Sequence, residues 1–148
     1  MTTSAAASRA PEFETAFRTL LADPAESARL CRVVLERGEN PGAKLLLAAA
    51  LRLQGDFEEA ERLATSLAQA VPRWAGAHFE QGMAVSRLGR PREAQQIFTM
   101  VDRLGGLPGL WREVGDARWA EGDHSGAEQA YLQHLGSRVL EPCVHAGI

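Results

Sequence analysis

The chain has 148 residues, 45% of them hydrophobic, which is enough apolar material for a buried core without support from metals or disulfides. Its formal net charge is −3, and its 16 basic residues are interleaved with 19 acidic ones, whereas a nucleic-acid-binding protein needs a clustered basic excess. No run approaches the roughly 18 apolar residues of a membrane span, and the first residues lack the apolar segment of a secretion signal. We therefore expect a cytoplasmic protein that binds neither nucleic acid nor membranes.

The first helices are expected directly after a tail at residues 1–10. A helix at 12–22 would place four apolar side chains on one stripe: Phe13, Phe17, Leu20 and Leu21. A second helix at 24–38 begins at Asp23-Pro24-Ala25-Glu26, which combines an N-cap residue, a proline in the first turn and an acid near the positive end of the helix dipole. These two helices form an irregular first pair.

Three glycines that each close an apolar stretch reveal an internal repeat. Gly55, Gly89 and Gly122 are 34 and 33 residues apart. Small or aromatic residues recur at fixed offsets from them, namely Ala48, Gly82 and Gly115 before the glycines, then Ala60, Ala94 and Ala127, and finally Ala64, Phe98 and Tyr131. A small residue at the first two of these offsets lets two antiparallel helices approach to the usual helix spacing. The pattern therefore predicts three further helix pairs, at 41–54/57–71, 75–88/91–104 and 108–121/124–136.

Local signals support the starts of the second helices in these pairs. Asp56 is expected to accept a hydrogen bond from the backbone near Glu59, as in a capping box. Pro91 suits a first helical turn, where its missing N–H costs nothing. The glycine-rich stretch 105–109 lies between helices and is predicted to be an inter-repeat turn.

The period and the motifs resemble those of the tetratricopeptide repeat. Trp111-Arg-Glu-Val-Gly115 is close to the start of that motif, and Gly55-Asp-Phe-Glu-Glu-Ala60 followed by Pro72 is close to its second half. Lys44 and His78 depart from it at the position of the motif tryptophan. The resemblance implies an all-α, right-handed superhelical array of about eight helices in antiparallel pairs. Its expected divisions are an N-terminal cap at 11–40, repeats at 41–74, 75–107 and 108–142, and a tail at 143–148.

The sequence offers no pattern for catalysis or for a cofactor. Cys31 and Cys143 form no CxxC pair, and Cys31 lies in an apolar string where a buried thiol is expected. His134 is expected to be partly buried. The four histidines show no metal-binding spacing, and the chain contains no GxSxG, GxGxxG or GxxxxGK[ST] motif. We therefore predict a protein that is not an enzyme and that has no cofactor and no metal.

The resemblance also implies where a partner would bind, because first helices of successive repeats line a concave groove in such arrays. Carried over by register, the groove positions are Leu45, Ala49, Arg52, Phe79, Met83, Ser86, Arg87, Arg112, Asp116 and Trp119. Aromatic residues and Arg concentrate binding energy at interfaces, so we predict a scaffold that binds a protein or peptide there. Phe79, Met83 and Trp119 are also compatible with a role in the core.

Two alternatives remain open. The last repeat, from Leu107 through Tyr131, resembles the end of the array in bacterial proteins that carry a C-terminal sulfotransferase domain, and no such domain is present here. The alternative prediction is therefore that the chain is a regulatory or substrate-presenting module of a larger enzyme. It is also expected to self-associate weakly through its end faces, with Val139 and Leu140 as a partial cap.

Overall fold

The computed structural model describes the backbone of residues 11–145 and the side chains of residues 11–136. Within this part the chain forms eight helices and no strand, which confirms the prediction of an all-α fold. The helices are α2 (Pro11–Thr19), α3 (Pro24–Glu36), α4 (Pro41–Leu53), α5 (Phe57–Ala70), α6 (Ala75–Arg87), α7 (Pro91–Arg103), α8 (Leu110–Ala120) and α9 (His124–His145). The predicted tail at residues 1–10 lies outside the described residues.

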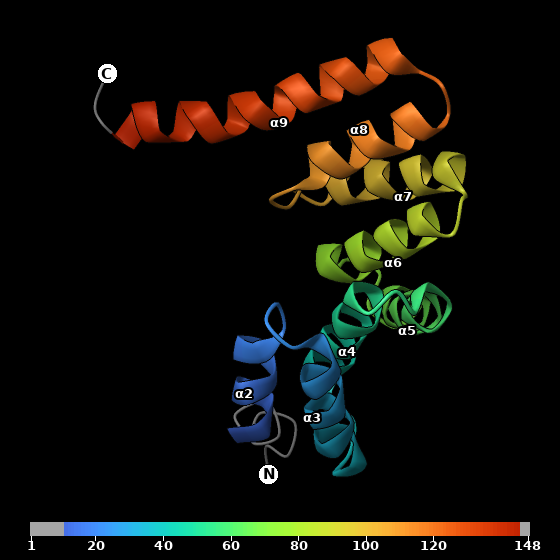
Figure 1. Cartoon of the computed structure of the whole chain (residues 1–148), viewed down its shortest axis with the longest axis vertical. Coiled ribbons are helices and arrows are strands. Elements are labelled where there is room, and N and C mark those ends of the chain that lie inside the picture. Colours follow the sequence, from blue (N-terminus) through green and yellow to red (C-terminus); the bar gives the residue numbers. More distant parts are fainter. Residues whose placement is uncertain (1–10, 146–148) are drawn as a thin grey trace.

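The helices follow one another along the long axis of the molecule, with α2 and α3 at one end and α8 and α9 at the other (Figure 1). Each helix packs against its neighbours in the chain, so that the helices form sequential antiparallel pairs. The first helix of each later pair ends at a glycine in the left-handed region: Gly55, Gly89 and Gly122, with φ of 87°, 83° and 84°. The repeating glycines thus mark the turns inside the pairs.

The two helices of a pair meet where the repeat places small residues. The alanines five residues after the turn glycines are almost fully buried: Ala60, Ala94 and Ala127. Gly82 on α6 faces the ring of Phe98 on α7, and a Cβ added to Gly82 would come within 2.5 Å of Cε1 of that ring. Gly115 on α8 faces the Tyr131 ring of α9 in the same way. An aromatic residue in the second helix therefore requires a glycine opposite it.

Buried apolar residues form a core that α6 links along the array. One cluster joins α2, α3, α4 and α5 with Ala84 of α6, and a second joins α6, α7, α8 and α9. A third, smaller cluster packs Ala77 of α6 against Leu67 and Ala68 of α5. Cys31 in the first cluster is fully buried, as predicted, and this burial raises the pKa of its thiol to about 11.

The helix cap that the sequence predicts is present at α3 but not at α5. Asp23 caps α3 as predicted, because its carboxylate accepts a hydrogen bond from the Glu26 N–H at 3.2 Å. Asn40 caps α4 through a bond from the Ala43 N–H at 3.1 Å. The predicted cap at Asp56 is wrong, since its side chain makes no capping hydrogen bond. The backbone φ is −88° at Asp56 but −148° and −151° at the two residues that cap, so the side chain leaves the backbone in a different direction.

The predicted helix bounds hold within two residues from α3 to α8, and they differ at both ends of the array. The helix α2 ends at Thr19 and not at residue 22. The last helix α9 continues to His145, past its predicted end at residue 136 and into the predicted tail. That end was placed at Gly136, which does not adopt the positive φ that would stop a helix. Val139 and Leu140 lie in α9, but their side chains are outside the described part.

Candidate protein-binding surface

The residues predicted to line the groove come from α4, α6 and α8, the first helices of three successive pairs. We call the accessible part of these three helices the first-helix surface. Ala49 and Met83 contribute little to it, because they are only 7% and 5% exposed. Met83 packs in the same cluster as Phe98 and Val114. Both side chains therefore belong to the core beneath the surface.

Leu45, Phe79 and Ser86 are partly buried on this surface. Leu45 packs against the cluster that joins α5 and α6, and its Cδ2 lies close to the backbone of Gly76. Phe79 meets Phe98 edge to face, with ring centroids 6.0 Å apart and an interplanar angle of 65°. Leu45 and Phe79 thus each pack partly against the core and lie partly on the surface.

Arg52 on α4 is engaged by a carboxylate of the next first helix. Its Nε lies 2.8 Å from Glu80 Oε1 and its Nη2 lies 3.3 Å from Oε2. The two side chains are only 17% and 14% exposed. A bidentate pair of this kind satisfies the guanidinium and joins α4 to α6. Arg52 is therefore neutralised within the chain.

Glu113 on α8 pairs with two arginines. Arg87 reaches it from α6 and so joins the two helices, and Arg112 is its neighbour on α8. We call these three residues the arginine cluster. Glu113 is 1% exposed, and its two oxygens lie 3.2 Å from Arg87 Nη1 and 3.4 Å from Arg112 Nη2. The Arg87 and Arg112 side chains remain 37% and 61% exposed. The cluster carries one surplus positive charge, and its guanidinium groups are accessible from solvent.

Asp116 on α8 is bound to the second helix of its own pair. The Tyr131 hydroxyl donates a hydrogen bond to Asp116 Oδ1 at 2.6 Å. This bond, burial and the negative charges of Asp116 and Glu113 raise the pKa of Tyr131 to about 12. Asp116 thus anchors α9 to α8, and one of its oxygens is occupied.

Trp119 lies at the C-terminal end of the surface and is 57% exposed. Its indole stacks at a tilt on the imidazole of His124, with centroids 4.1 Å apart. Together with Glu128, Tyr131 and Leu132 these rings line an open hollow of about 550 Å³. Trp119 is therefore exposed where the first-helix surface borders this hollow on α9.

Sequence reasoning missed the two carboxylates that organise this surface, Glu80 and Glu113. A signal for them exists, because both stand nine residues before a turn glycine, Gly89 and Gly122. Glutamate at the same place in two repeats indicates an inter-repeat contact. The basic edge that the groove register predicts is thus partly neutralised by acids from the adjacent helices.

Solved structures share this architecture. TTC0263, a thermophilic TPR protein of Thermus thermophilus, matches with a TM-score of 0.70 and 19% identity over 82% of this chain and 69% of its own. The chain has a tetratricopeptide-repeat (TPR)-like fold. MamA of AMB-1 matches the TPR-like array with a TM-score of 0.63 and 18% identity over 84% of this chain and 70% of its own. No protein-family model matches the sequence, and no curated protein is significantly similar to it.

These matches establish the fold of the TPR-like array and not its partner. The right-handed sense of the superhelix and the resemblance to sulfotransferase-linked arrays stay predictions. No described helix is long and apolar enough to cross a membrane. The described residues also contain no group of three or more His, Cys, Asp or Glu side chains that could hold a metal ion.

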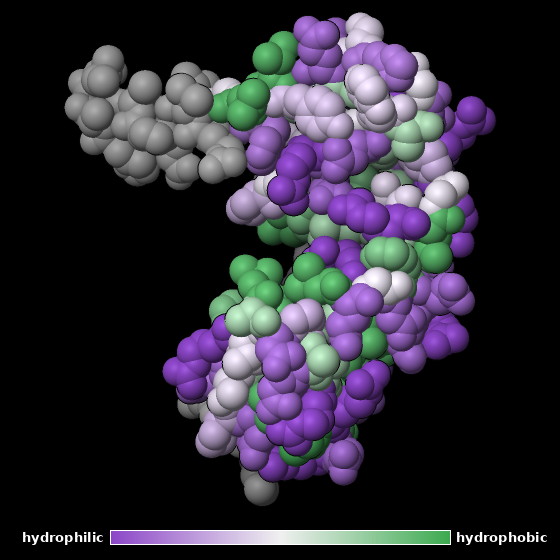
Figure 2. All heavy atoms as spheres, in the orientation of Figure 1, coloured by the Kyte–Doolittle hydropathy of each residue, from purple (hydrophilic) through white to green (hydrophobic). Residues whose placement is uncertain are grey.

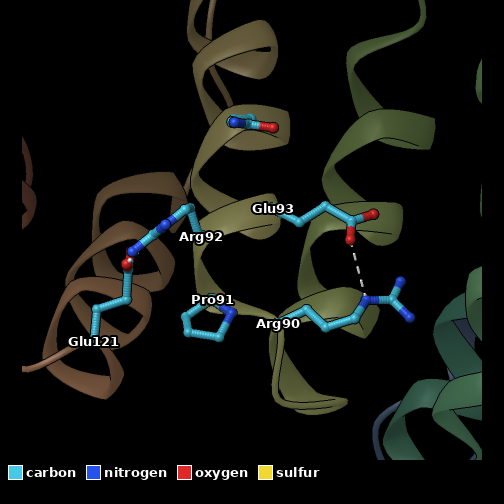
Figure 3. A pocket seen from close by; sticks show the side chains of 6 residues that line it. Arg90, Pro91, Arg92, Glu93 and Glu121 are labelled. Carbon is cyan, nitrogen blue, oxygen red and sulfur yellow. Dashed lines mark hydrogen bonds and ion pairs between the residues drawn. The ribbon is translucent and has the colours of Figure 1, made fainter.

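An open hollow of about 820 Å³ lies on the TPR-like array where α7 begins, beside the end of α8. Figure 3 shows that its charged side chains point toward one another: Glu93 toward Arg90, and Arg92 toward Glu121. The Arg90 Nε lies 3.2 Å from Glu93 Oε1, and the Arg92 Nε lies 3.4 Å from Glu121 Oε2. These pairs leave the hollow without a surplus charge for a ligand. The Arg92–Glu121 pair joins neighbouring repeats, whereas the Arg90–Glu93 pair lies at the start of α7 itself.

A second hollow, of about 700 Å³, lies at the turn between α7 and α8. The glycine-rich segment 105–109 forms its rim, and Trp111, Arg112 and His134 contribute side chains. His134 is partly buried, as predicted, and stands twelve residues after Gly122. Leu67 and Val101, the counterparts of His134 in the two preceding repeats, are buried against the next first helix. The hollow thus borders the first-helix surface at Arg112.

Proposed function

We propose that this chain is a non-catalytic scaffold that binds a protein or peptide segment on its first-helix surface. TPR-like arrays are in general protein-interaction scaffolds and are usually non-catalytic. The residues that we assign to binding are exposed or partly exposed members of the predicted groove: Phe79, Ser86, Arg87, Arg112 and Trp119. Arg52 is omitted from this set because Glu80 already neutralises it.

The arginine cluster is the observation that carries the proposal. Two guanidinium groups from successive first helices converge on a single carboxylate, Glu113, and both remain accessible. A second carboxylate, supplied by a partner, would complete the charge balance of Arg87 and Arg112. Charge-assisted hydrogen bonds from Arg to carboxylate are among the stronger polar contacts in proteins. We therefore infer a partner segment with acidic side chains.

Apolar side chains on the same surface define the rest of the partner segment. Phe79 presents part of its ring on α6, and Trp119 is more than half exposed on α8. Exposed aromatic residues and Arg are the residue types that dominate interface energetics. A segment that combines acidic with apolar residues, such as an amphipathic helix, matches both features.

The experiment starts from peptides selected against the purified protein from an unbiased library. Labelled selected peptides are then titrated by fluorescence anisotropy with the wild-type protein and with Arg112→Glu. We expect selected sequences to be acidic, and Arg112→Glu to weaken binding by about tenfold or more, the loss of one charge-assisted contact. Arg92→Glu is the matched control, since Arg92 lies on α7, is 87% exposed and also neighbours a glutamate.

Two results would refute the proposal. The first is selection of peptides without an acidic bias, whose affinity does not depend on Arg112. The second is an equal loss of affinity in Arg112→Glu and Arg92→Glu, which would indicate a nonspecific effect of net charge. Circular dichroism must show that both variants retain the helicity of the wild-type protein.

A further inference from the structure

The open hollow beside Trp119 combines apolar walls with one carboxylate. It measures about 550 Å³ and lies where α8 ends and α9 begins. Trp119 and Leu132, which are 57% and 59% exposed, provide the apolar walls, and Glu128 provides the carboxylate, so we call it the Trp119–Glu128 hollow. Figure 2 shows apolar side chains beside polar ones along α9. A group that covers this hollow removes water from the carboxylate and must offer a positive charge in return.

The carboxylate of Glu128 is exposed and has no basic partner among the described side chains. Arg118 of α8 is already engaged, because its Nη1 donates to the Gly126 carbonyl at 3.1 Å and its Nε donates to α7. His124 also lines the hollow, but its imidazole stacks on the Trp119 indole. The described part of the chain therefore leaves this negative charge without a counter-ion.

The repeat register indicates which kind of group this position accepts. Glu128 is the fifth residue of α9, and the fifth residues of α5 and α7 are Glu61 and Gln95. Glu61 pairs with Arg90, which belongs to the turn after α6. Gln95 Oε1 accepts a hydrogen bond from Arg118 Nε of α8 at 3.3 Å. In the two preceding pairs the position thus receives a guanidinium from the helix pair that follows, and at α9 the described chain supplies none.

The walls of the hollow suit the rest of an arginine side chain. A guanidinium is planar and stacks on aromatic faces, and tryptophan is the ring that attracts cations most strongly. The Trp119 indole is more than half exposed, and the Tyr131 ring is held in place because its hydroxyl donates to Asp116 Oδ1 at 2.6 Å. Leu132 offers apolar surface to the methylene groups. An arginine side chain would therefore find a counter-ion, an aromatic ring and apolar contact in one place.

We propose that the Trp119–Glu128 hollow binds an arginine side chain of the partner segment. This proposal rests on the proposed scaffold function, and it adds a basic residue to a segment whose acidic residues bind the arginine cluster. Trp119 belongs to both the first-helix surface and the hollow, so one segment can reach the two places. Opposite charges at the two places fix the direction in which the segment lies on the array.

The distance between the two places sets the spacing of charges in the partner. Arg112 and Trp119 are seven residues apart on α8, which corresponds to about 10 Å along the helix axis. We therefore expect the acidic residue and the arginine of the partner to be separated by about three residues in an extended segment, or by about seven in a helix.

The test repeats the peptide selection on the wild-type protein, on Glu128→Gln and on Glu58→Gln. The first substitution removes the charge of the hollow and keeps the shape of the side chain, and the second alters another exposed glutamate, on α5. The wild-type protein and Glu58→Gln should enrich arginine at the predicted spacing from an acidic residue. Glu128→Gln should lose the arginine and keep the acidic residue, because the arginine cluster is unchanged.

A double-mutant cycle measures the contact itself. A selected peptide, and its counterpart with citrulline as an uncharged analogue of arginine, are titrated by fluorescence anisotropy with the wild-type protein and with Glu128→Gln. Glu128→Gln should weaken binding of the arginine peptide by about fivefold, the upper range for an exposed ion pair. It should not weaken binding of the citrulline peptide, because both changes remove the same interaction.

Three results would overturn this proposal and leave the scaffold function intact. The first is a set of selected peptides that depend on Arg112 but contain no enriched arginine. The second is an equal effect of Glu128→Gln on the arginine and citrulline peptides, which would place the arginine elsewhere. The third is an equal loss of arginine in the selection on Glu58→Gln, which would indicate an effect of net charge.

The opposite pattern would separate the two proposals in the other direction. Coupling between the peptide arginine and Glu128 without any dependence on Arg112 would support the hollow and refute the arginine cluster as the acid-binding site. Circular dichroism should be unchanged in Glu128→Gln, since that side chain is exposed.

Discussion

The contact between Gly82 and Phe98 allows a quantitative test of how the helix pairs pack. In the variant Gly82→Ala one methyl group is added on α6. That methyl would lie 2.5 Å from Cε1 and 2.9 Å from Cδ1 of Phe98, and 3.2 Å from Cγ2 of Ile97. Phe98 is only 1% exposed and also contacts Phe79, so its ring has little room to move away. The two helices must separate or the ring must leave its rotamer.

Two opposing effects determine the sign. Replacing Gly by Ala in a helix interior stabilises the helix by about 1 kcal/mol. Overpacking a buried contact by one methyl group costs about 1–3 kcal/mol, and distances below 3 Å to a buried ring place this site in the upper part of that range. We therefore expect a net destabilisation of about 1–2 kcal/mol, which lowers the Tm by about 3–8 °C for a chain of this length.

The assay is urea denaturation followed by circular dichroism, with Gly136→Ala as the control. Gly136 is helical and a Cβ there would have open space within 4 Å, so only the propensity gain applies. The control should raise the midpoint slightly while Gly82→Ala lowers it. Combining Gly82→Ala with Phe98→Leu should recover about 1 kcal/mol relative to the sum of the single effects, because the smaller side chain relieves the clash.

A stabilised Gly82→Ala protein would refute this reasoning. It would mean that the helix pair accepts a methyl group at this contact and that the glycine is not required by the Phe98 ring. Additive effects of Gly82→Ala and Phe98→Leu would lead to the same conclusion.

Three further outcomes are expected. Glu113→Gln should destabilise the fold by about 1–3 kcal/mol in urea denaturation, since it leaves two partly exposed arginines without their buried carboxylate, whereas the exposed Glu93→Gln should have little effect. Tyr131 is the only tyrosine, so its ultraviolet titration should show a midpoint near 12, and Asp116→Asn should shift it toward 10. Folding favours the neutral phenol, so this contribution to stability is complete below pH 10 and is lost as the pH rises toward 12. The buried Cys31 thiol, with its pKa raised to about 11, should react with a thiol reagent at pH 8 only after unfolding, measured in a Cys143→Ala background.

The sequence by itself determined the repeat and the helix pairs. The spacing of Gly55, Gly89 and Gly122 is a local property, because a left-handed residue ends a helix wherever it occurs. The buried alanines of the second helices also follow from periodicity, since each repeat solves the same packing problem. Bounds within two residues from α3 to α8 are a consequence of these signals.

Only the tertiary structure decided which groove residues are accessible and which charges are free. Met83 fits the groove register but is buried, because α7 and α8 both pack around it. Arg52 and Arg87 are arginines of neighbouring first helices, and the sequence does not distinguish them. In the structure Arg52 is mostly buried in its pair with Glu80, whereas Arg87 stays partly exposed beside Glu113. The net charge of such a site depends on partners more than 25 residues away in the chain, and these distances close only when the helices stack. The same holds for the end faces, where Phe17 and Leu132 are exposed because the array provides no described neighbour for them.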